Sequence, residues 1–288
     1  MTSRLIIFVA IMLGLSACEK IDVGRIENLN GGTISVIGHG GSGFQSAFNE
    51  LPENSMASIK RAVEIYNADG VELDIQLTKD HQLVPYHDNK LETSTDGYGY
   101  VYEFNLSELK EVKYNNEFYA SLFLNETITS LEDVLIYFSN RRIKPQLHLD
   151  LRTWLFNPDI FTQSEFIDVY AEKLVELIER YNYSPYTFIG SSSKESLLAI
   201  SKINPNLKLC FETESIRSNN DFLQDNSIYG IIAYNDRISN SEIEFAHRNN
   251  IRVILFNVKS QKSIVEAVNK NPDYIITDNI PKLQQVLF

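Results

Sequence analysis

The segment from Val71 to Asp88, VELDIQLTKDHQLVPYHD, places acidic side chains and a histidine in an apolar run that is typical of a core strand. Side chains alternate along a strand, so Glu72 and Asp74 point to the same face. Two unpaired carboxylates on a buried face repel each other and are costly to desolvate. A divalent cation removes this penalty, and carboxylate oxygens favour Ca²⁺ or Mg²⁺ over Zn²⁺. The pattern predicts that both acids bind a metal ion; a solvent-facing strand is the alternative.

Neighbouring segments can bring further reactive side chains to these acids. The polar turn TKDH is too short for a parallel crossover, so a hairpin is expected that returns His87 to the acids. His39 ends the strand candidate ISVIGH. Asp150 lies near the end of the candidate QLHLDL and Arg152 directly follows it, and the two share a face. His148 is expected to face away from Asp150 and to be structural. Two histidines, three acids and one arginine are therefore expected to converge.

This combination suits metal-assisted phosphoryl transfer. A cation neutralises the non-bridging phosphate oxygens, and Arg152 adds positive charge. One of His39 and His87 takes a proton from the nucleophile and the other protonates the leaving alkoxide, roles open to two groups with ordinary pKa values of about 6.5. The alternatives are that the histidines are structural, and that Asp150 and Arg152 form only an ion pair between strands.

The elements that must position these residues alternate between short strands and helices. Most strand candidates are apolar throughout, as expected for strands buried on both faces. Eight alternations favour a (β/α)8 TIM barrel, which usually has about 250 residues and carries its active site at the carboxyl ends of the strands. A doubly wound open sheet is the alternative, although no Gly-x-Gly-x-x-Gly follows a strand. The candidates span residues 34–39, 70–75, 146–151, 186–191, 207–212, 229–234, 252–257 and 274–279.

The segments between the strands are helical in pattern, with one exception. Apolar residues recur at three-to-four spacing in five segments, and Asn54 or Ser55 is expected to cap the first of them. Residues 89–129 instead form an irregular stretch after the hairpin, with only the helical piece NLSELKEV. About 40 such residues are unusual in a compact domain and often functional. The five helical segments are residues 55–66, 164–181, 194–203, 241–249 and 263–270.

The first residues of the chain have a pattern that is typical of an export signal. Residues 1–17 place one arginine before an apolar run that is too short for a spanning helix. The tetrapeptide LSAC at 15–18 resembles a bacterial lipobox, so Cys18 is expected to be lipidated and to anchor the protein to a membrane of the bacterial cell envelope; a plain secretory signal is the alternative. Residues 18–32 are predicted to be a tether, and residues 33–288 the barrel.

Composition excludes several classes of function. The formal charge of −12 makes nucleic acid an unexpected partner. Beyond Cys18 only Cys210 remains, so an internal disulfide and a cysteine-ligated zinc site are excluded. Cys210 lies in the apolar run LKLCFE and is expected to be a buried, inert thiol.

At several spaced positions the sequence resembles the glycerophosphodiester phosphodiesterase family. The resemblance extends over most of the chain beyond the tether, and five elements match in order between residues 52 and 88. The matching stretches are HGG (39–41), PENS (52–55), VELDIQLTKDHQLVPYHD (71–88), TSTDGYG (93–99), HLDLR (148–152), ILFN (254–257) and IITDNI (275–280).

The resemblance implies a TIM barrel with an insertion at about residues 89–129. It also implies that a phosphodiester of glycerol, derived from deacylated phospholipid, is hydrolysed to an alcohol and glycerol phosphate. The site roles that it implies are His39 and His87 as acid/base residues, and Glu72, Asp74 and Asp150 as ligands of one Ca²⁺ or Mg²⁺ ion.

Three positions depart from the family pattern. Gly40 stands where the family has a phosphate-binding arginine, and Asp150 where glutamate is usual. Arg152 replaces a lysine, which keeps the charge and adds a bidentate fork. The loss at Gly40 leaves two alternatives open: a catalytically silent barrel that binds a phosphorylated or sugar ligand, and a related phosphodiesterase that acts on another lipid head group.

Overall fold

The structure is a computed structural model that describes residues 24–46, 49–115 and 125–288. The predicted signal peptide, Cys18 and the first part of the tether lie outside these residues. No helix in the described ranges is long and apolar enough to cross a membrane.

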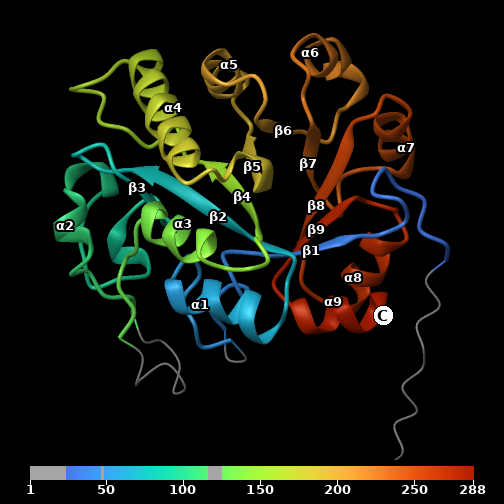
Figure 1. The fold of residues 1–288 in the computed structure, drawn as a ribbon, viewed down its shortest axis with the longest axis horizontal. Helices are drawn as coiled ribbons and strands as arrows, with labels where there is room; N and C mark the ends of the chain where they lie inside the picture. Colours follow the sequence, from blue (N-terminus) through green and yellow to red (C-terminus); the bar gives the residue numbers. More distant parts are fainter. Residues whose placement is uncertain (1–23, 47–48, 116–124) are drawn as a thin grey trace, which may run out of the picture.

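Eight parallel strands form the centre of the molecule (Figure 1). β1 pairs with β9 on one side and with β2 on the other, so the sheet closes on itself. The predicted (β/α)8 barrel is confirmed, and the open sheet is wrong. The parallel strands are β1 Ser35–Gly38, β2 Gly70–Leu77, β4 Gln146–Leu151, β5 Thr187–Ser191, β6 Lys208–Glu212, β7 Gly230–Tyr234, β8 Arg252–Val258 and β9 Tyr274–Thr277.

Helices surround the barrel and cover its outer face (Figure 1). Ser55 caps the first of them by accepting a hydrogen bond from the Ser58 N–H at 3.2 Å, and its last turn continues as a π-helix, Arg61–Ile65. α3, α6 and α9 are short and are not among the helices predicted above. The surrounding helices are α1 Met56–Lys60, α3 Leu131–Ser139, α4 Gln163–Arg180, α5 Lys194–Ile203, α6 Asn220–Asp225, α7 Asn240–Arg248, α8 Gln261–Val268 and α9 Ile280–Leu287.

Alternation along the strands separates two environments. Leu73 and Ile75 of β2 point outward into the main core between strands and helices. Inside the barrel, a smaller apolar cluster of Ile37, Phe188, Cys210, Ile254, Tyr274 and Ile276 fills the interior. Cys210 is fully buried there, and burial raises the pKa of its thiol to about 12, as expected for an inert cysteine.

The predicted hairpin is confirmed. β3, Leu83–Pro85, runs antiparallel to β2 with Pro85 opposite Ile75. The residues that follow lie beside β3, outside the barrel, and include the short helix α2, Leu106–Leu109 (Figure 1). A second small core holds this region together: Val84, Tyr86, Leu91, Val101, Leu109, Tyr114 and Ile128.

The last part of the predicted tether is bonded to the barrel. The Leu29 N–H donates to Asp273 Oδ1 at 2.8 Å, and Asn28 Nδ2 donates to the Pro272 carbonyl at 2.8 Å. Asp273 immediately precedes β9, so these contacts lie at the amino-terminal end of the barrel. The chain therefore enters the fold at the end opposite to the carboxyl ends of the strands.

Candidate active site

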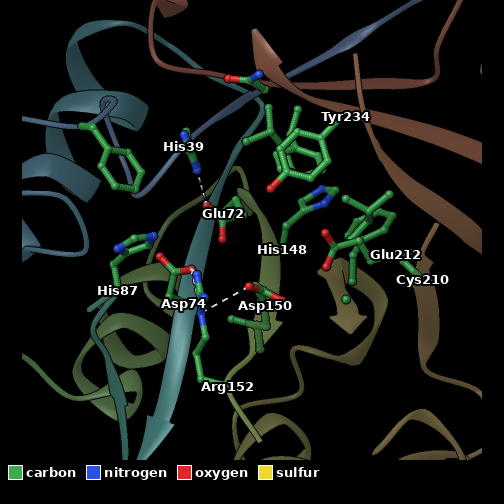
Figure 2. A pocket seen from close by; sticks show the side chains of 18 of the residues that line it. His39, Glu72, Asp74, His87, His148, Asp150, Arg152, Cys210, Glu212 and Tyr234 are labelled. Atoms are coloured by element: carbon green, nitrogen blue, oxygen red, sulfur yellow. Dashed lines mark hydrogen bonds and ion pairs between the residues drawn. The ribbon is translucent and has the colours of Figure 1, made fainter. Parts of the chain in front are cut away.

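A cavity of about 510 Å³ opens where the strands end, and all six residues predicted to form the site line it (Figure 2). They come from strands or hairpin segments at four places in the chain. The structure thus brings together His39, Glu72, Asp74, His87, Asp150 and Arg152.

Register between β2 and β4 sets the acids side by side. Asp74 lies opposite Asp150, and Glu72 lies opposite His148. Because residues two apart share a face, His148 points into the barrel with Asp150. The expectation that His148 faces away from Asp150 is therefore wrong. Its ring is buried and stacks on Phe188 with centroids 4.2 Å apart, and burial and the charge of Lys208 lower its pKa to about 3.

Arg152 bridges the two aspartates. Its guanidinium pairs with Asp74 Oδ1, and its Nε lies 3.3 Å from Asp150 Oδ2. Burial would raise the pKa of Asp74, but the charge of Arg152 outweighs this effect and keeps that pKa below its usual range. The ion pair of Asp150 and Arg152, given above as the alternative to a functional role, is present, and it extends to a second acid.

Asn54 completes the hydrogen bonding of Asp74. Its Nδ2 donates to Asp74 Oδ2 at 2.9 Å, and its Oδ1 accepts from the Asp74 N–H at 3.1 Å. The backbone of Asn54 is left-handed, with φ 61°, and Ser55 is the helix cap. Asn54 therefore supports the site, a role that the motif PENS alone did not indicate.

The site holds more carboxyl groups than Arg152 pairs with. Burial and the charge of Asp74 raise the pKa of Glu72 to about 8. Burial raises the pKa of Asp150 to about 7, with Arg152 acting in the opposite direction. Three crowded carboxylates with hard oxygen donors suit a divalent cation. As the described side chains stand, however, no group of three or more histidine, cysteine, aspartate or glutamate residues could hold an ion.

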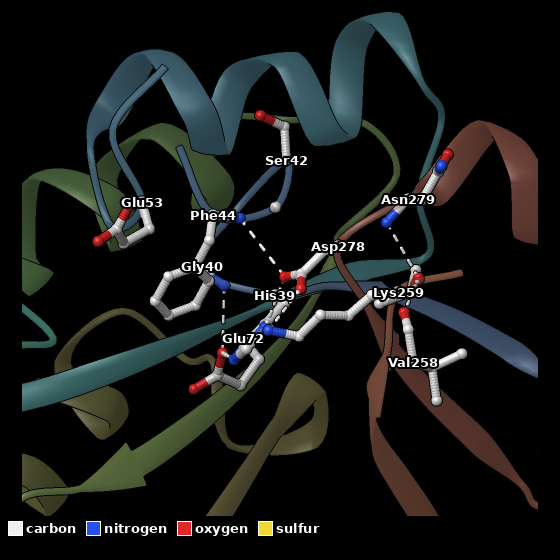
Figure 3. A network of polar contacts seen from close by, with 12 residues as sticks. His39, Gly40, Ser42, Phe44, Glu53, Glu72, Val258, Lys259, Asp278 and Asn279 are labelled. Carbon is white, nitrogen blue, oxygen red and sulfur yellow. Dashed lines mark hydrogen bonds and ion pairs between the residues drawn. The ribbon is translucent and has the colours of Figure 1, made fainter. Parts of the chain in front are cut away.

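His39 is held by Asp278, a residue that the sequence did not single out. Its Nδ1 lies 2.7 Å from Asp278 Oδ1, while its Nε2 lies 3.9 Å from Glu72 Oε2 (Figure 3). Burial would lower the pKa of His39, but the hydrogen bond to Asp278 and the neighbouring acids raise it to about 9. Lys259 contacts the other Asp278 oxygen at 3.3 Å. The sequence feature that could have identified Asp278 is its position as an acid at the end of the strand candidate YIITDN.

His87 lies at the same end of the barrel as His39. The Phe44 ring contacts both imidazoles, with centroids 4.4 Å from His39 and 4.9 Å from His87. His87 Nδ1 lies 3.1 Å from Asp88 Oδ1. Burial lowers the pKa of His87, but the hydrogen bond to Asp88 and the charge of Asp74 outweigh it and raise that pKa.

The backbone at Gly40 explains why no arginine stands there. Gly40 has φ 55°, and a Cβ at this position would lie 2.7 Å from the Glu53 Cβ. Its N–H donates to Glu72 Oε2 at 3.2 Å (Figure 3). Gly40 therefore orients a carboxylate, and the positive charge of the family arginine is absent. Arg152 and Lys259 are the arginine and lysine side chains that line the cavity within the described residues.

The closed barrel and the polar cavity at its carboxyl end define a TIM-barrel enzyme. The model of the glycerophosphoryl diester phosphodiesterase family matches residues 45–282. The chain belongs to this family and is a phosphoric diester hydrolase.

Individual relatives agree with the family match. A glycerophosphodiester phosphodiesterase of Bacillus altitudinis is 30% identical, over 79% of this chain and 89% of that protein. One of Caldanaerobacter subterraneus is 29% identical, over 80% of this chain and 89% of that protein.

Solved structures share the fold. An Oleispira antarctica phosphodiesterase in complex with the product sn-glycerol-3-phosphate superimposes with a TM-score of 0.74 and 21% identity, covering 88% of this chain and 96% of that one. A glycerophosphodiester phosphodiesterase of Parabacteroides distasonis gives a TM-score of 0.72 with the same identity and coverage.

Proposed function

We propose that this enzyme hydrolyses glycerophosphodiesters to an alcohol and glycerol phosphate, with a divalent cation bound by its acids. The observation that carries the proposal is the convergence of two histidines, three carboxylates and Arg152 on one cavity. The family match and the product complex of a structural relative support the substrate class.

The histidines transfer protons through their Nε2 atoms. Asp278 occupies Nδ1 of His39, and Asp88 occupies Nδ1 of His87. Each carboxylate orients its imidazole and leaves Nε2 to exchange a proton. One histidine accepts the proton of the attacking hydroxyl or water, and the other donates a proton to the leaving alkoxide.

Charge on the phosphate is balanced by Arg152, Lys259 and the cation. Glu72, Asp74 and Asp150 would hold Ca²⁺ or Mg²⁺, which supplies charge neutralisation of the non-bridging oxygens when bound. Arg152 then shares its charge between the aspartates and the phosphate.

The assay that tests this function uses the purified protein and several glycerophosphodiesters, with Ca²⁺ or Mg²⁺ present. Glycerol phosphate is expected as a product, quantified by an enzyme-coupled assay and identified by mass spectrometry. Thermal stabilisation by these ligands without turnover would favour the silent barrel, for which Gly40 is the supporting observation. Release of a cyclic phosphate, or turnover only of a phosphosphingolipid or phosphoinositide, would favour the other phosphodiesterase.

We also propose that Cys18 is lipidated and anchors the enzyme to a membrane of the bacterial cell envelope. The lipobox-like LSAC supports this, and a lipidated terminus with several acyl chains binds stably. The bonded segment at residues 27–30 enters the barrel end opposite to the cavity, so an anchor on this side leaves the cavity open.

The Cys18→Ser variant is expected to move from the membrane fraction to the soluble envelope fraction, because the acyl-bearing thiol is removed. Cell fractionation and labelling with a radioactive fatty acid measure the change. Cys210→Ala is the matched control, since its buried thiol lies inside the barrel, and it is expected to stay with the membrane. Membrane retention and labelling of Cys18→Ser would contradict the anchor.

A further inference from the structure

The far wall of the cavity has features that the hydrolytic site does not use. In the closed barrel, β6 lies across from β1, and β7 lies across from β2. Glu212 is the last residue of β6 and Tyr234 the last of β7. Both line the cavity, and Figure 2 shows them on the other side of the central acids from His39 and His87.

Glu212 is a carboxylate without a direct ion-pair partner in the described part of the chain, although the charges of Arg152 and Arg237 act on it from a distance. Within the described residues, no side chain or backbone group forms a hydrogen bond or ion pair with its carboxylate. The side chain is partly buried, and burial and the charge of Glu214 raise the pKa of Glu212. A buried acid left unpaired is costly, so this position favours a ligand with positive charge.

His148 supplies a second acceptor. Its Nε2 lies 3.3 Å from Gln146 Oε1, an oxygen that can only accept, so Nε2 carries the proton. With the proton on Nε2, Nδ1 is the acceptor atom of the ring. Nδ1 is buried without a partner in the described part of the chain, and His148 lines the same cavity as Glu212.

The aromatic rings of this wall are already in contact with other groups. The Arg237 guanidinium lies 3.8 Å from the Tyr234 ring centroid, and the Phe256 ring lies 4.0 Å from it. Arg152 lies over Trp154 at 5.2 Å. An open aromatic cage, which a quaternary ammonium group prefers, is therefore not available on these rings. The free groups are acceptors, and the carboxylate favours a hydrogen-bond donor that also carries positive charge.

We propose that the wall formed by Glu212 and His148 binds a primary ammonium head group, so that the preferred substrates are glycerophosphodiesters of an ethanolamine-type amino alcohol. The proposal rests on the function proposed above. The ammonium group donates hydrogen bonds to the Glu212 carboxylate and to His148 Nδ1, while the phosphate lies at the central site.

The test compares glycerophosphoethanolamine, glycerophosphocholine and glycerophosphoglycerol on the full enzyme. The kcat/KM for the ethanolamine diester is expected to exceed the other two by about tenfold or more, as a charge-assisted hydrogen bond to a buried group allows. Glu212→Gln is expected to remove most of this preference, and Glu212→Asp to retain part of it. Glu214→Gln, which removes a nearby charge that does not line the cavity, is expected to keep it.

Equal kcat/KM values for the three diesters, preference for the choline diester, or equal effects of Glu212→Gln and Glu214→Gln would overturn the head-group proposal. These outcomes would leave the proposed hydrolysis intact. The binding affinity of the same three diesters, measured by calorimetry, does not depend on turnover. If no diester were hydrolysed, the proposed hydrolytic function would be wrong. Tighter binding of glycerophosphoethanolamine than of the other two diesters would still support the ammonium site.

Discussion

Replacing His39 with glutamine is expected to lower kcat for glycerophosphodiester hydrolysis by about 10²–10⁴-fold, the usual contribution of a general acid or base. Glutamine keeps a polar side chain next to Asp278 but cannot exchange a proton near neutral pH. The loss should fall on kcat more than on KM, because proton transfer occurs only in the transition state. Steady-state kinetics with one diester at saturating Ca²⁺ or Mg²⁺ measure it.

The matched control is His81→Asn, another histidine substitution outside the cavity. His81 lies in the hairpin turn with φ 60°, a conformation that asparagine tolerates. This variant should keep near-wild-type kcat. The acid/base role would be refuted by a folded His39→Gln protein that turns over like the wild type; melting followed by circular dichroism checks the folding.

The barrel and the central acids could be predicted because both depend on local alternation. Glu72 and Asp74 point to one face of the strand and Leu73 points to the other. This alternation of side chains holds for any strand. The same rule, correctly applied, would have placed His148 with Asp150.

Asp278 could not be assigned to His39 from the sequence. The two residues are 239 positions apart, and they meet because β9 closes the barrel against β1. An acid at the carboxyl end of a barrel strand is expected near the cavity. The residue that it pairs with, however, depends on the strand order and on the last residue of the neighbouring strand.

The role of Asn54 and the path of residues 89–128 could not be predicted for a different reason. Asparagine before a helix is most often a cap, and its left-handed backbone and its bonds to Asp74 depend on tertiary packing. Residues 89–128 lack a repeating apolar period, so the sequence indicated an insertion without its path. The small core that includes Tyr86 and Leu109 forms only when the turns of this region are in place.

Removal of divalent cations by chelation is expected to abolish turnover, with a loss of at least about 100-fold, and added Ca²⁺ or Mg²⁺ should restore it. Without a cation, Arg152 is paired with Asp74 and Asp150 and is less available to the phosphate. The phosphate then lacks the charge neutralisation that the cation supplies. The measurement is kcat/KM after EDTA treatment and after titration with each cation.

Protein stability gives a second measurement of the same site that does not depend on the reaction. A cation at 100 times its Kd should stabilise the fold by about 2.7 kcal/mol, because it binds only the native arrangement of the acids. Asp150→Asn removes one predicted ligand and should weaken this cation-dependent rise in Tm. Asp168→Asn, an exposed change on α4, should keep it. Full turnover in excess EDTA, or equal Tm shifts in both variants, would mean that Glu72, Asp74 and Asp150 do not hold a catalytic ion, and Arg152 and Lys259 would then be the charges that bind the phosphate.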